Sequence, residues 1–393
     1  MPLSIRHIPV YAYIIYLPLL FQKVCFIKSN IKIIHSTFIA KDFIFLTSKR
    51  TRQVKNLLTQ LNKMLSKLSH KELLKLAQRQ CIPPLLSTFH KGQAGGRVCI
   101  IGGCEDYTGA PYFSANATAL MGCDLTHVIC EYNAATVIKS YTPNLMVHPY
   151  MRMSNSYLPN GDPVHSDMDK IKNLLQRMHV IVIGPGLGRD KDMLKSIKEI
   201  IRFDLEQLGG QLPIVIDADG LFLVSEDHDT RALLKRFPRG RIILTPNVVE
   251  MKRIRDSLSK QCSSEIDIVN ELKCILVEKG TEDAIYSPGE GNDILKNKQE
   301  GSNKRVGGQG DTLTGTIACM LAYCRAIYDF KVYRPDHNSE YLKDWIDYAM
   351  LSCYVGCTIT RESARLAFKQ SGRAMQTTDV NNRVGEVYAR LFD

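Results

Sequence analysis

The chain has 393 residues, which is enough for one large α/β domain or two smaller ones. Its hydrophobic fraction of 45% and its charged fraction of 23% are typical of a soluble globular protein. The net charge of +11 would suggest a nucleic-acid or membrane partner, but it is concentrated at one end of the chain. Residues 1–63 hold ten Lys or Arg and one acidic residue, so they carry +9 and leave +2 for residues 64–393. The charge therefore argues against both kinds of partner for residues 64–393.

Residues 1–63 are rich in Ile, Tyr, Phe and Lys. Their apolar run at 8–21 is broken by Pro9 and Pro18 and is shorter than the roughly 20 residues of a membrane span. No small-residue cleavage site follows it, although the scarcity of acids fits a mitochondrial presequence. Three interpretations stay open: a disposable or mis-assigned extension with the natural start at Met64, a targeting segment, and a membrane anchor. The first is favoured, which predicts a cytoplasmic protein; the second would predict mitochondria.

The regular part of the chain begins at Met64. Leu and Ile recur near helical spacing up to the pair Pro83-Pro84, and Ser69 and Glu72 have the spacing of a capping box. A helix is therefore predicted to start at Ser69.

Short β-rich runs then alternate with helical patterns. Strands are predicted over residues 97–103, which end in glycines, and over 126–130, 180–184, 214–219, 241–246 and 274–280; a helix is predicted over 115–121. Because these strands are apolar on both faces and separated by helices, we expect a mostly parallel central sheet with helices on both faces. The polar stretch 287–304 is predicted to be a surface excursion, with a hairpin as one form. Without a repeat or a strong linker, residues 64–393 are predicted to form one α/β domain after the basic extension 1–63.

The twelve cysteines are expected to be free. No C-x-x-C pair occurs, and no group of Cys and His has zinc spacing. Seven of them lie in apolar strand-like runs, tight turns or helical patterns: Cys99, Cys104, Cys130, Cys319, Cys324, Cys353 and Cys357. We expect small buried core residues and a reducing compartment.

A glycine-rich segment at 305–315 opens an apolar helical pattern and is the strongest functional signal. Glycine amides that point into a concavity, together with the positive end of a helix, bind anions such as a phosphate in transfer. Asp311 at the helix start is in the right place for a base facing a substrate hydroxyl. The alternative is that Asp311 only caps the helix, but four glycines within nine residues exceed what capping needs. No Gly-Lys-Ser/Thr follows, so this is not a Walker A loop.

Two further loops follow predicted strands. The loop Gly-Pro-Gly-Leu-Gly at 184–188 favours a close approach of backbone to a ligand over a plain turn. Asn247 and Glu250 are three residues apart at a helix start, so both could face one site, where a carboxylate could hold Mg²⁺ through water. A capped helix with solvated charges is an equal alternative for this pair.

Six blocks in this order resemble the ATP-dependent (S)-NAD(P)H-hydrate dehydratase family in its eukaryotic form. They are Gly-Gly-Cys-Glu-Asp-Tyr-Thr-Gly-Ala-Pro at 102–111, Gly-Pro-Gly-Leu-Gly at 184–188, Asp-Ala-Asp-Gly at 217–220, Thr-Pro-Asn at 245–247, Glu-Lys-Gly at 278–280 and Gly-Gly-Gln-Gly-Asp at 307–311. The resemblance covers residue 64 to the C-terminus. The similar ADP-using bacterial branch has His-x-Gly-Glu after Thr-Pro, where this chain has Asn-Val-Val-Glu at 247–250, which favours the ATP-using branch.

The resemblance implies a ribokinase-like α/β fold, with ATP as co-substrate, Mg²⁺, and hydrated NADH and NADPH (NADHX and NADPHX) as substrates. It implies that ATP is held by Lys279, Gly280, Thr281, Glu282, Asp283, Gly301, Ser302, Asn303, Lys304, Arg305, Val306, Gly307, Gly308, Gln309 and Gly310. It implies that the hydrate is held by Gly188, Asn247, Val248, Val249, Glu250, Met251, Lys252, Arg253 and Asp311. Glu250 is the candidate metal residue and Asp311 the candidate catalytic residue.

The predicted reaction phosphorylates the hydroxyl of the hydrated ring and then expels phosphate. The alternative enzyme is a small-molecule kinase of the same fold, which would stop at the phosphorylated product. A basic binding protein for nucleic acid or membrane is supported only by residues 1–63. A homo-oligomer stays open.

Overall fold

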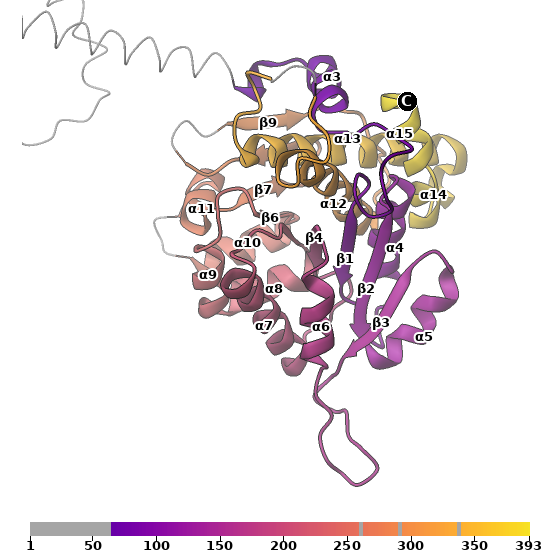
Figure 1. Cartoon of the computed structure of the whole chain (residues 1–393), viewed down its shortest axis with the longest axis vertical. Helices are drawn as coiled ribbons and strands as arrows, with labels where there is room; N and C mark the ends of the chain where they lie inside the picture. The colour runs from indigo at the N-terminus through magenta and orange to yellow at the C-terminus, as the bar shows by residue number, and fades with distance from the viewer. Residues whose placement is uncertain (1–63, 259–261, 290–292, 336–338) are drawn as a thin grey trace, which may run out of the picture. The chain divides into compact units, whose positions relative to one another are not determined.

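The computed structural model describes residues 64–258, 262–289, 293–335 and 339–393, which lie in one compact unit (Figure 1). The predictions made for residues 1–63 fall outside these ranges. Within them, no helix is long and apolar enough to cross a membrane.

A nine-stranded sheet forms the centre of the described residues, in the order β3-β2-β1-β4-β5-β6-β7-β8-β9. Strands β1 to β7 are parallel, while β8 is antiparallel to both β7 and β9. Their bounds are β1 Arg97–Ile101, β2 Leu125–Glu131, β3 Met146–Met151, β4 Val180–Ile183, β5 Ile214–Ile216, β6 Ile242–Leu244, β7 Ile275–Glu278, β8 Asp283–Tyr286 and β9 Ile294–Asn297. The predicted mostly parallel sheet is confirmed, and each of the six predicted strands is present and begins within one residue of its predicted start. Strands β1, β4, β5, β6 and β7 end one to three residues earlier than predicted, because the polar and glycine residues at their ends belong to the loops that follow.

The strand order reverses between β1 and β4. The chain passes outward from β1 to β2 and β3, and then returns to the other side of β1 with β4. In open parallel sheets, ligands bind beyond the carboxyl ends of the strands near such a reversal. The fold therefore predicts a site beyond the ends of β1 and β4 and their neighbours.

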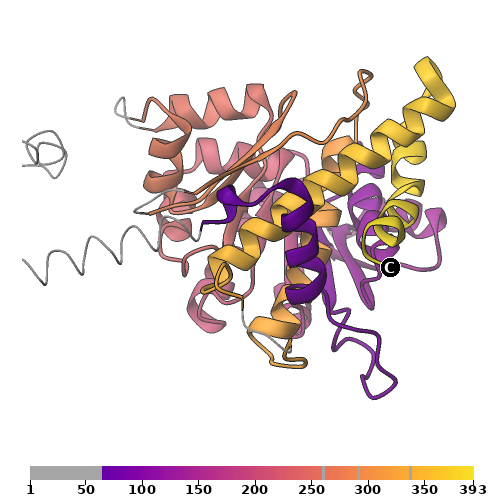
Figure 2. The same ribbon diagram turned by 90° about the horizontal axis from the view of Figure 1, so that it is seen from above.

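Helices cover both faces of the sheet (Figures 1 and 2). Within β1, Val98 and Ile100 belong to one core, while Cys99 and Ile101 belong to the other, as strand alternation requires. The first core includes residues of α3 His70–Gln80, α4 Gly109–Leu120, α5 Tyr132–Tyr141, α12 Gln309–Tyr328, α13 Trp345–Ser371 and α15 Val384–Phe392. The second includes residues of α6 Met168–Leu175, α7 Lys191–Gln207, α8 Ala218–Glu226, α9 His228–Leu234, α10 Val248–Ser257 and α11 Glu265–Leu272. The short helices η3 Leu65–Lys67, η4 Gly372–Ala374 and α14 Thr377–Asn382 complete the described elements.

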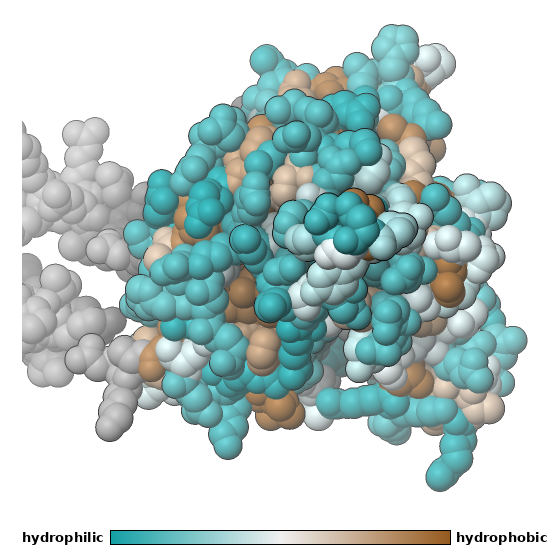
Figure 3. All heavy atoms as spheres, turned by 90° about the horizontal axis from the view of Figure 1, so that it is seen from below, coloured by the Kyte–Doolittle hydropathy of each residue, from teal (hydrophilic) through white to brown (hydrophobic). Residues whose placement is uncertain are grey.

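Apolar residues are concentrated in these two cores. The face of the molecule in Figure 3 carries mainly hydrophilic residues, with hydrophobic ones in small scattered groups. A sheet that is apolar on both faces is stable only when helices remove both faces from water.

One of two predicted helix starts is confirmed, and the other is wrong. The capping box of Ser69 and Glu72 is present and begins α3, which lies beside α13 (Figure 2). The helix predicted over 115–121 instead begins at Gly109, so that prediction was wrong about its start. Pro111 falls in the first turn of α4, where its missing N–H group would have no intrahelical acceptor, and it therefore does not break the helix.

The polar stretch 287–304 contains β9, which pairs with β8 as a hairpin at the edge of the sheet. Its residues are not all exposed, because Leu295 and Asn297 are buried. The Asn297 amide donates to the carbonyl of Tyr354 and to Thr358 Oγ1, at 3.0 and 2.7 Å. The hairpin is thus attached to α13 and is not simply a surface excursion.

The described cysteines are free, as predicted. All of them are buried except Cys123, which is partly buried. They act as small apolar residues of the core.

Helix α12 packs unusually closely against both of its neighbours. A Cβ atom added at Gly315 would lie 2.1 Å from the carbonyl oxygen of Ser114 in α4. One added at Gly356 of α13 would lie 3.0 Å from the amide nitrogen of Ile317 in α12. Because backbone cannot move aside as a flexible side chain can, these two glycines determine where α12 lies, and therefore where its N-terminus points.

Candidate active site

The glycine-rich segment leads into α12 as the sequence predicted. Gly308 is the N-cap residue with φ of 94°, a left-handed conformation that favours glycine, and no side chain caps the helix. Asp311 lies in the first turn, and among the described residues its carboxylate accepts no hydrogen bond. Asp311 therefore does not act as the cap of α12, and its carboxylate is free to meet a ligand.

An ion pair lies beside this helix start. Asp217, directly after β5, accepts a hydrogen bond from Lys279 Nζ, directly after β7, at 2.8 Å. The Asp217 side chain is only 4% exposed. A Cβ added at Gly310 would lie 3.4 Å from both Asp217 Oδ2 and Lys279 Nζ, so the first turn of α12 contacts the pair.

Several carboxylates share the single ammonium group of Lys279. Burial, and then the charge of Asp217, raises the pKa of Asp311 well above its ordinary value, although Lys279 opposes the shift. Burial and Asp217 likewise raise the pKa of Glu250. Burial acts against the charge of Lys279, but Asp217 and Glu250 together leave the pKa of Lys279 above its ordinary value. The ammonium group therefore stays charged, while Asp311 is a stronger base than an exposed aspartate.

Asn247 and Glu250 form a capping box at the start of α10. Asn247 Oδ1 accepts from the amides of Val249 and Glu250 at 2.9 and 3.0 Å, and Glu250 Oε2 accepts from the Asn247 amide at 2.8 Å. The capped-helix alternative is thus correct, but it does not exclude a role in the site. Both side chains also line the cavity described next.

A cavity of about 910 Å³ lies beyond the carboxyl ends of β5, β6 and β7, next to the start of α12. Most of the candidate residues line it: Asn247, Glu250, Lys279, Gly280, Thr281, Glu282, Asp283, Gly301, Ser302, Asn303, Arg305, Val306, Gly308, Gln309, Gly310 and Asp311. Three segments that are distant in the sequence thus meet at one place.

Three candidate residues face elsewhere. Lys304 Nζ donates to the carbonyls of Arg373 and Met375, so this side chain holds the C-terminal segment in place. The carbonyl of Gly307 accepts from Thr377 Oγ1. Met251 is buried in the second core.

The remaining candidates lie toward α8. The amide of Gly188 donates to Asp219 Oδ2 at 3.0 Å. The guanidinium of Arg253 lies 5.7 Å from the centre of the Phe222 ring. The other three, Val248, Val249 and Lys252, are exposed at the start of α10.

The sequence predicted that the loop at 184–188 approaches a ligand, but Gly184 is required by a close contact within the protein, and so is the neighbouring Gly102. A Cβ at Gly184 would lie 1.9 Å from the carbonyl oxygen of Asp217, and one at Gly102 would lie 2.1 Å from that of Pro185. These glycines allow the ends of β1, β4 and β5 to approach one another. The close approach of backbone that the sequence predicted is therefore made to the protein itself.

Several residues that line the cavity were not predicted. They include Asp217, Ala218, Thr360 and Arg361. Asp217 could have been found, because a polar residue directly after a buried strand is a typical site residue. Arg361 could not, because it lies inside a long helix whose pattern otherwise indicates only burial.

No group of three or more His, Cys, Asp or Glu in the described ranges could hold a metal ion. A resident metal centre with a full set of protein ligands is therefore absent from this part of the chain. Glu250, the residue predicted to hold Mg²⁺ through water, lines the cavity.

Solved structures show which fold this chain has. A ribokinase-like superfamily protein from Enterococcus faecalis has a TM-score of 0.59 at 22% identity, with 82% of this chain and 95% of that chain covered. An ADP/ATP-dependent NAD(P)H-hydrate dehydratase from Bacillus subtilis, co-crystallised with ATP and Mg²⁺, has a TM-score of 0.54 at 19% identity, with 80% and 96% covered. The chain has a ribokinase-like α/β fold, as predicted.

Sequence comparison is more specific. The model of the NAD(P)H-hydrate dehydratase family matches residues 98–384. An ATP-dependent (S)-NAD(P)H-hydrate dehydratase of Saccharomyces cerevisiae is 66% identical over 342 residues, covering 84% of this chain and all of the relative. A protein of the same name from Phaeosphaeria nodorum is 43% identical over 333 residues, covering 82% of this chain and 96% of the relative. The chain belongs to the NAD(P)H-hydrate dehydratase family.

The raised pKa of Asp311 makes a prediction about stability. A carboxyl group whose pKa is higher in the folded than in the unfolded protein favours folding at low pH, and this contribution is lost as the pH rises through the folded-state value. Asp311→Asn removes the buried charge at nearly constant size. We expect its melting temperature to exceed that of the wild type at neutral pH, with the difference shrinking toward pH 4. Melting curves across this range test it, and a variant that is less stable at neutral pH would contradict the assignment of an aspartate with a raised pKa.

Proposed function

We propose that this protein uses ATP to dehydrate the S epimers of hydrated NADH and NADPH, regenerating the reduced dinucleotides and releasing ADP and phosphate. The observation that carries the proposal is the partly buried carboxylate of Asp311, which does not cap the helix and lies at a glycine-rich helix start beside Lys279. The 66% identity to a yeast protein of that name supports the choice of reaction.

Asp311 acts first on the hydroxyl group at C6 of the hydrated nicotinamide ring. As its carboxylate takes the hydroxyl proton, the oxygen attacks the γ-phosphorus of ATP, the bond to the bridging oxygen breaks, and ADP leaves. The amides at the start of α12 and the ammonium group of Lys279 stabilise the negative charge of the transferring group. The raised pKa of Asp311 supports this role, because a base is more effective when its pKa approaches the working pH.

Phosphate departure completes the reaction. Hydroxide is a poor leaving group, whereas phosphate is a good one. The ring nitrogen donates its electron pair to form a C6–N1 double bond as the C6–O bond breaks. Loss of a proton from C5 then forms the C5–C6 double bond of the reduced dinucleotide. The same helix start therefore serves twice, because it binds the phosphoryl group in transfer and the phosphate in departure.

We assign the nucleotide to the cavity walls at 279–283 and 301–310, and the hydrate to Gly188 and residues 247–253. Within the second set, the fixed amide of Gly188 and the capped start of α10 support a rigid binding surface. The buried Met251 contributes to this surface only by holding α10 against the core.

Mg²⁺ would enter with the nucleotide. It usually takes one or two carboxylates and otherwise keeps waters and phosphate oxygens, which matches a cavity without a three-ligand cluster in the described residues. Glu250 is the residue that would hold the ion. Burial, and then the charge of Asp217, raises the pKa of Glu250, so a cation beside its carboxylate would offset an unfavourable negative charge. Bound there, the ion would supply charge neutralisation for the phosphates.

Product analysis tests the reaction. The protein should regenerate one NADH from its S hydrate for each ADP and each phosphate released, measured by absorbance and phosphate assay. Asp311→Asn should lower turnover by roughly 10²–10⁴-fold, the usual size of a general-base contribution. A stable phosphorylated hydrate would favour the alternative kinase, and recovery without nucleotide would overturn the assignment. ADP working as well as ATP would overturn only the choice of branch.

We also propose that residues 64–393 are the complete catalytic unit and that the protein acts in the cytoplasm. The motifs of the family all lie after residue 64, which supports this division. Deleting residues 1–63 should leave turnover and melting temperature nearly unchanged. Loss of soluble, active protein would contradict this division, and import of a reporter carrying residues 1–63 into mitochondria would contradict the cytoplasmic assignment.

A further inference from the structure

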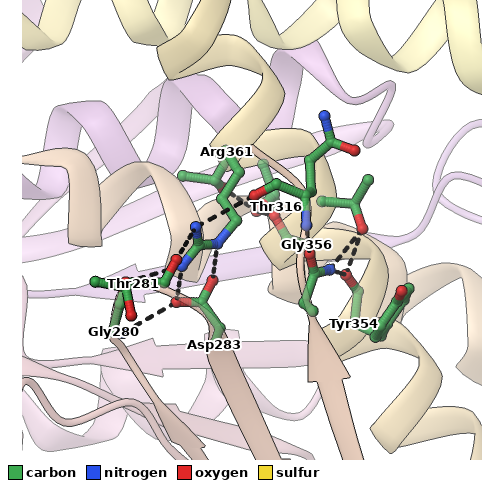
Figure 4. A network of polar contacts seen from close by, with 11 residues as sticks. Gly280, Thr281, Asp283, Thr316, Tyr354, Gly356 and Arg361 are labelled. Carbon is green, nitrogen blue, oxygen red and sulfur yellow. Dashed lines mark hydrogen bonds and ion pairs between the residues drawn. The ribbon is translucent and has the colours of Figure 1, made fainter. Parts of the chain in front are cut away.

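One side chain of α13 holds both loops that form the nucleotide side of the cavity. Arg361 donates to the two carboxylate oxygens of Asp283 at 2.7 and 2.8 Å (Figure 4). It also donates to the carbonyls of Gly280 and Thr281, each at 2.8 Å, and to that of Gln299 at 3.3 Å. The side chain is 11% exposed and lines the cavity. The planar guanidinium group thereby binds acceptors on two separate stretches of the chain, residues 280–283 and Gln299.

These contacts fix two loops relative to each other. Gly280 to Asp283 form the turn between β7 and β8, and the Asp283 carboxylate also accepts from the Gly280 amide at 3.2 Å. Gln299 follows β9 and leads to the glycine-rich segment that begins α12. Gly280 is next to Lys279, so the turn that Arg361 holds also determines where the ammonium group is placed.

Helix α13 is in turn fixed to α12. Thr316 Oγ1 of α12 lies 3.1 Å from Thr360 Oγ1 and donates to the carbonyl of Gly356 at 3.2 Å. Thr360 is adjacent to Arg361 in the sequence, and Gly356 allows the close backbone contact described above. The position of Arg361 is therefore set by the same helix pair that places Asp311.

We propose that Arg361 is a positioning residue for ATP, which holds the β7–β8 turn and the segment after β9 in register with the start of α12. This rests on the proposed use of ATP at this cavity. The hydrogen bonds that Arg361 donates all go to these two loops, so it acts on the nucleotide through them.

Arg361→Lys is the direct test. Lysine keeps the charge, but its single ammonium group cannot bind two carboxylate oxygens and three carbonyls in one plane. We expect the affinity for the β,γ-imido analogue of ATP with Mg²⁺, measured by calorimetry, to fall by about 10- to 100-fold, since hydrogen bonds to charged groups are the strong ones. The KM for ATP should rise similarly, while the KM for the hydrate stays near the wild-type value.

Arg365→Lys is the matched control, because Arg365 lies one turn further along α13 and pairs with Glu362 outside the cavity at 2.6 and 2.7 Å. It should bind the analogue as the wild type does. Asp283→Asn provides a second route, because it weakens the same contact from the loop side and should reduce affinity in the same direction. Equal affinity of the wild type, Arg361→Lys and Asp283→Asn would overturn the role of Arg361 alone. A wild type that does not bind the analogue would overturn the use of ATP as well.

Discussion

The ion pair between Asp217 and Lys279 is the interaction on which the site depends. It joins the ends of β5 and β7, with β6 between them, and it lies against the first turn of α12. Asp217, Glu250 and Asp311 share one ammonium group, so carboxylates outnumber the cation that neutralises them. Burial, together with this excess of negative charge, raises the pKa of Asp311. The same excess favours a nucleotide that brings a cation with it over a free polyanion.

Close backbone contacts provide the rigidity that such a site requires. Gly184 and Gly102 allow three strand ends to meet, and Gly315 and Gly356 allow α12 to lie against two helices. A buried charge that is disfavoured by its surroundings persists only where the surrounding structure cannot relax around it. The glycines and the raised pKa of Asp311 therefore belong to one arrangement, in which close packing keeps the carboxylate next to Asp217. Arg361 extends this arrangement to the loops on the nucleotide side.

Much of this arrangement could be predicted from the sequence, because the signals are local. Runs apolar on both faces identified the strands, and the segment at 305–315 identified the helix start with Asp311. The start of α4 was missed, because the residues of its first turn, Pro111 among them, carry no apolar helical pattern. Arg361 was missed because its partners are about 60 to 80 residues away in the chain, and no local pattern marks them. The loop at 184–188 was expected to bring backbone close to a ligand, but only the fold shows that Gly184 makes its close contact with the carbonyl of Asp217 at the end of β5.

The dependence of turnover on pH tests the central claim, namely that burial and the charge of Asp217 together raise the pKa of Asp311. Asp311 must be ionised to accept a proton, so kcat of the wild type should rise with pH through a limb that lies well above the ordinary range of an aspartate. Asp217→Asn removes the neighbouring negative charge. The ammonium group of Lys279 then interacts with the carboxylates of Asp311 and Glu250 without competition from Asp217. The account therefore predicts that the limb moves to lower pH in Asp217→Asn. A limb that stays in place, or that moves to higher pH, would contradict the account.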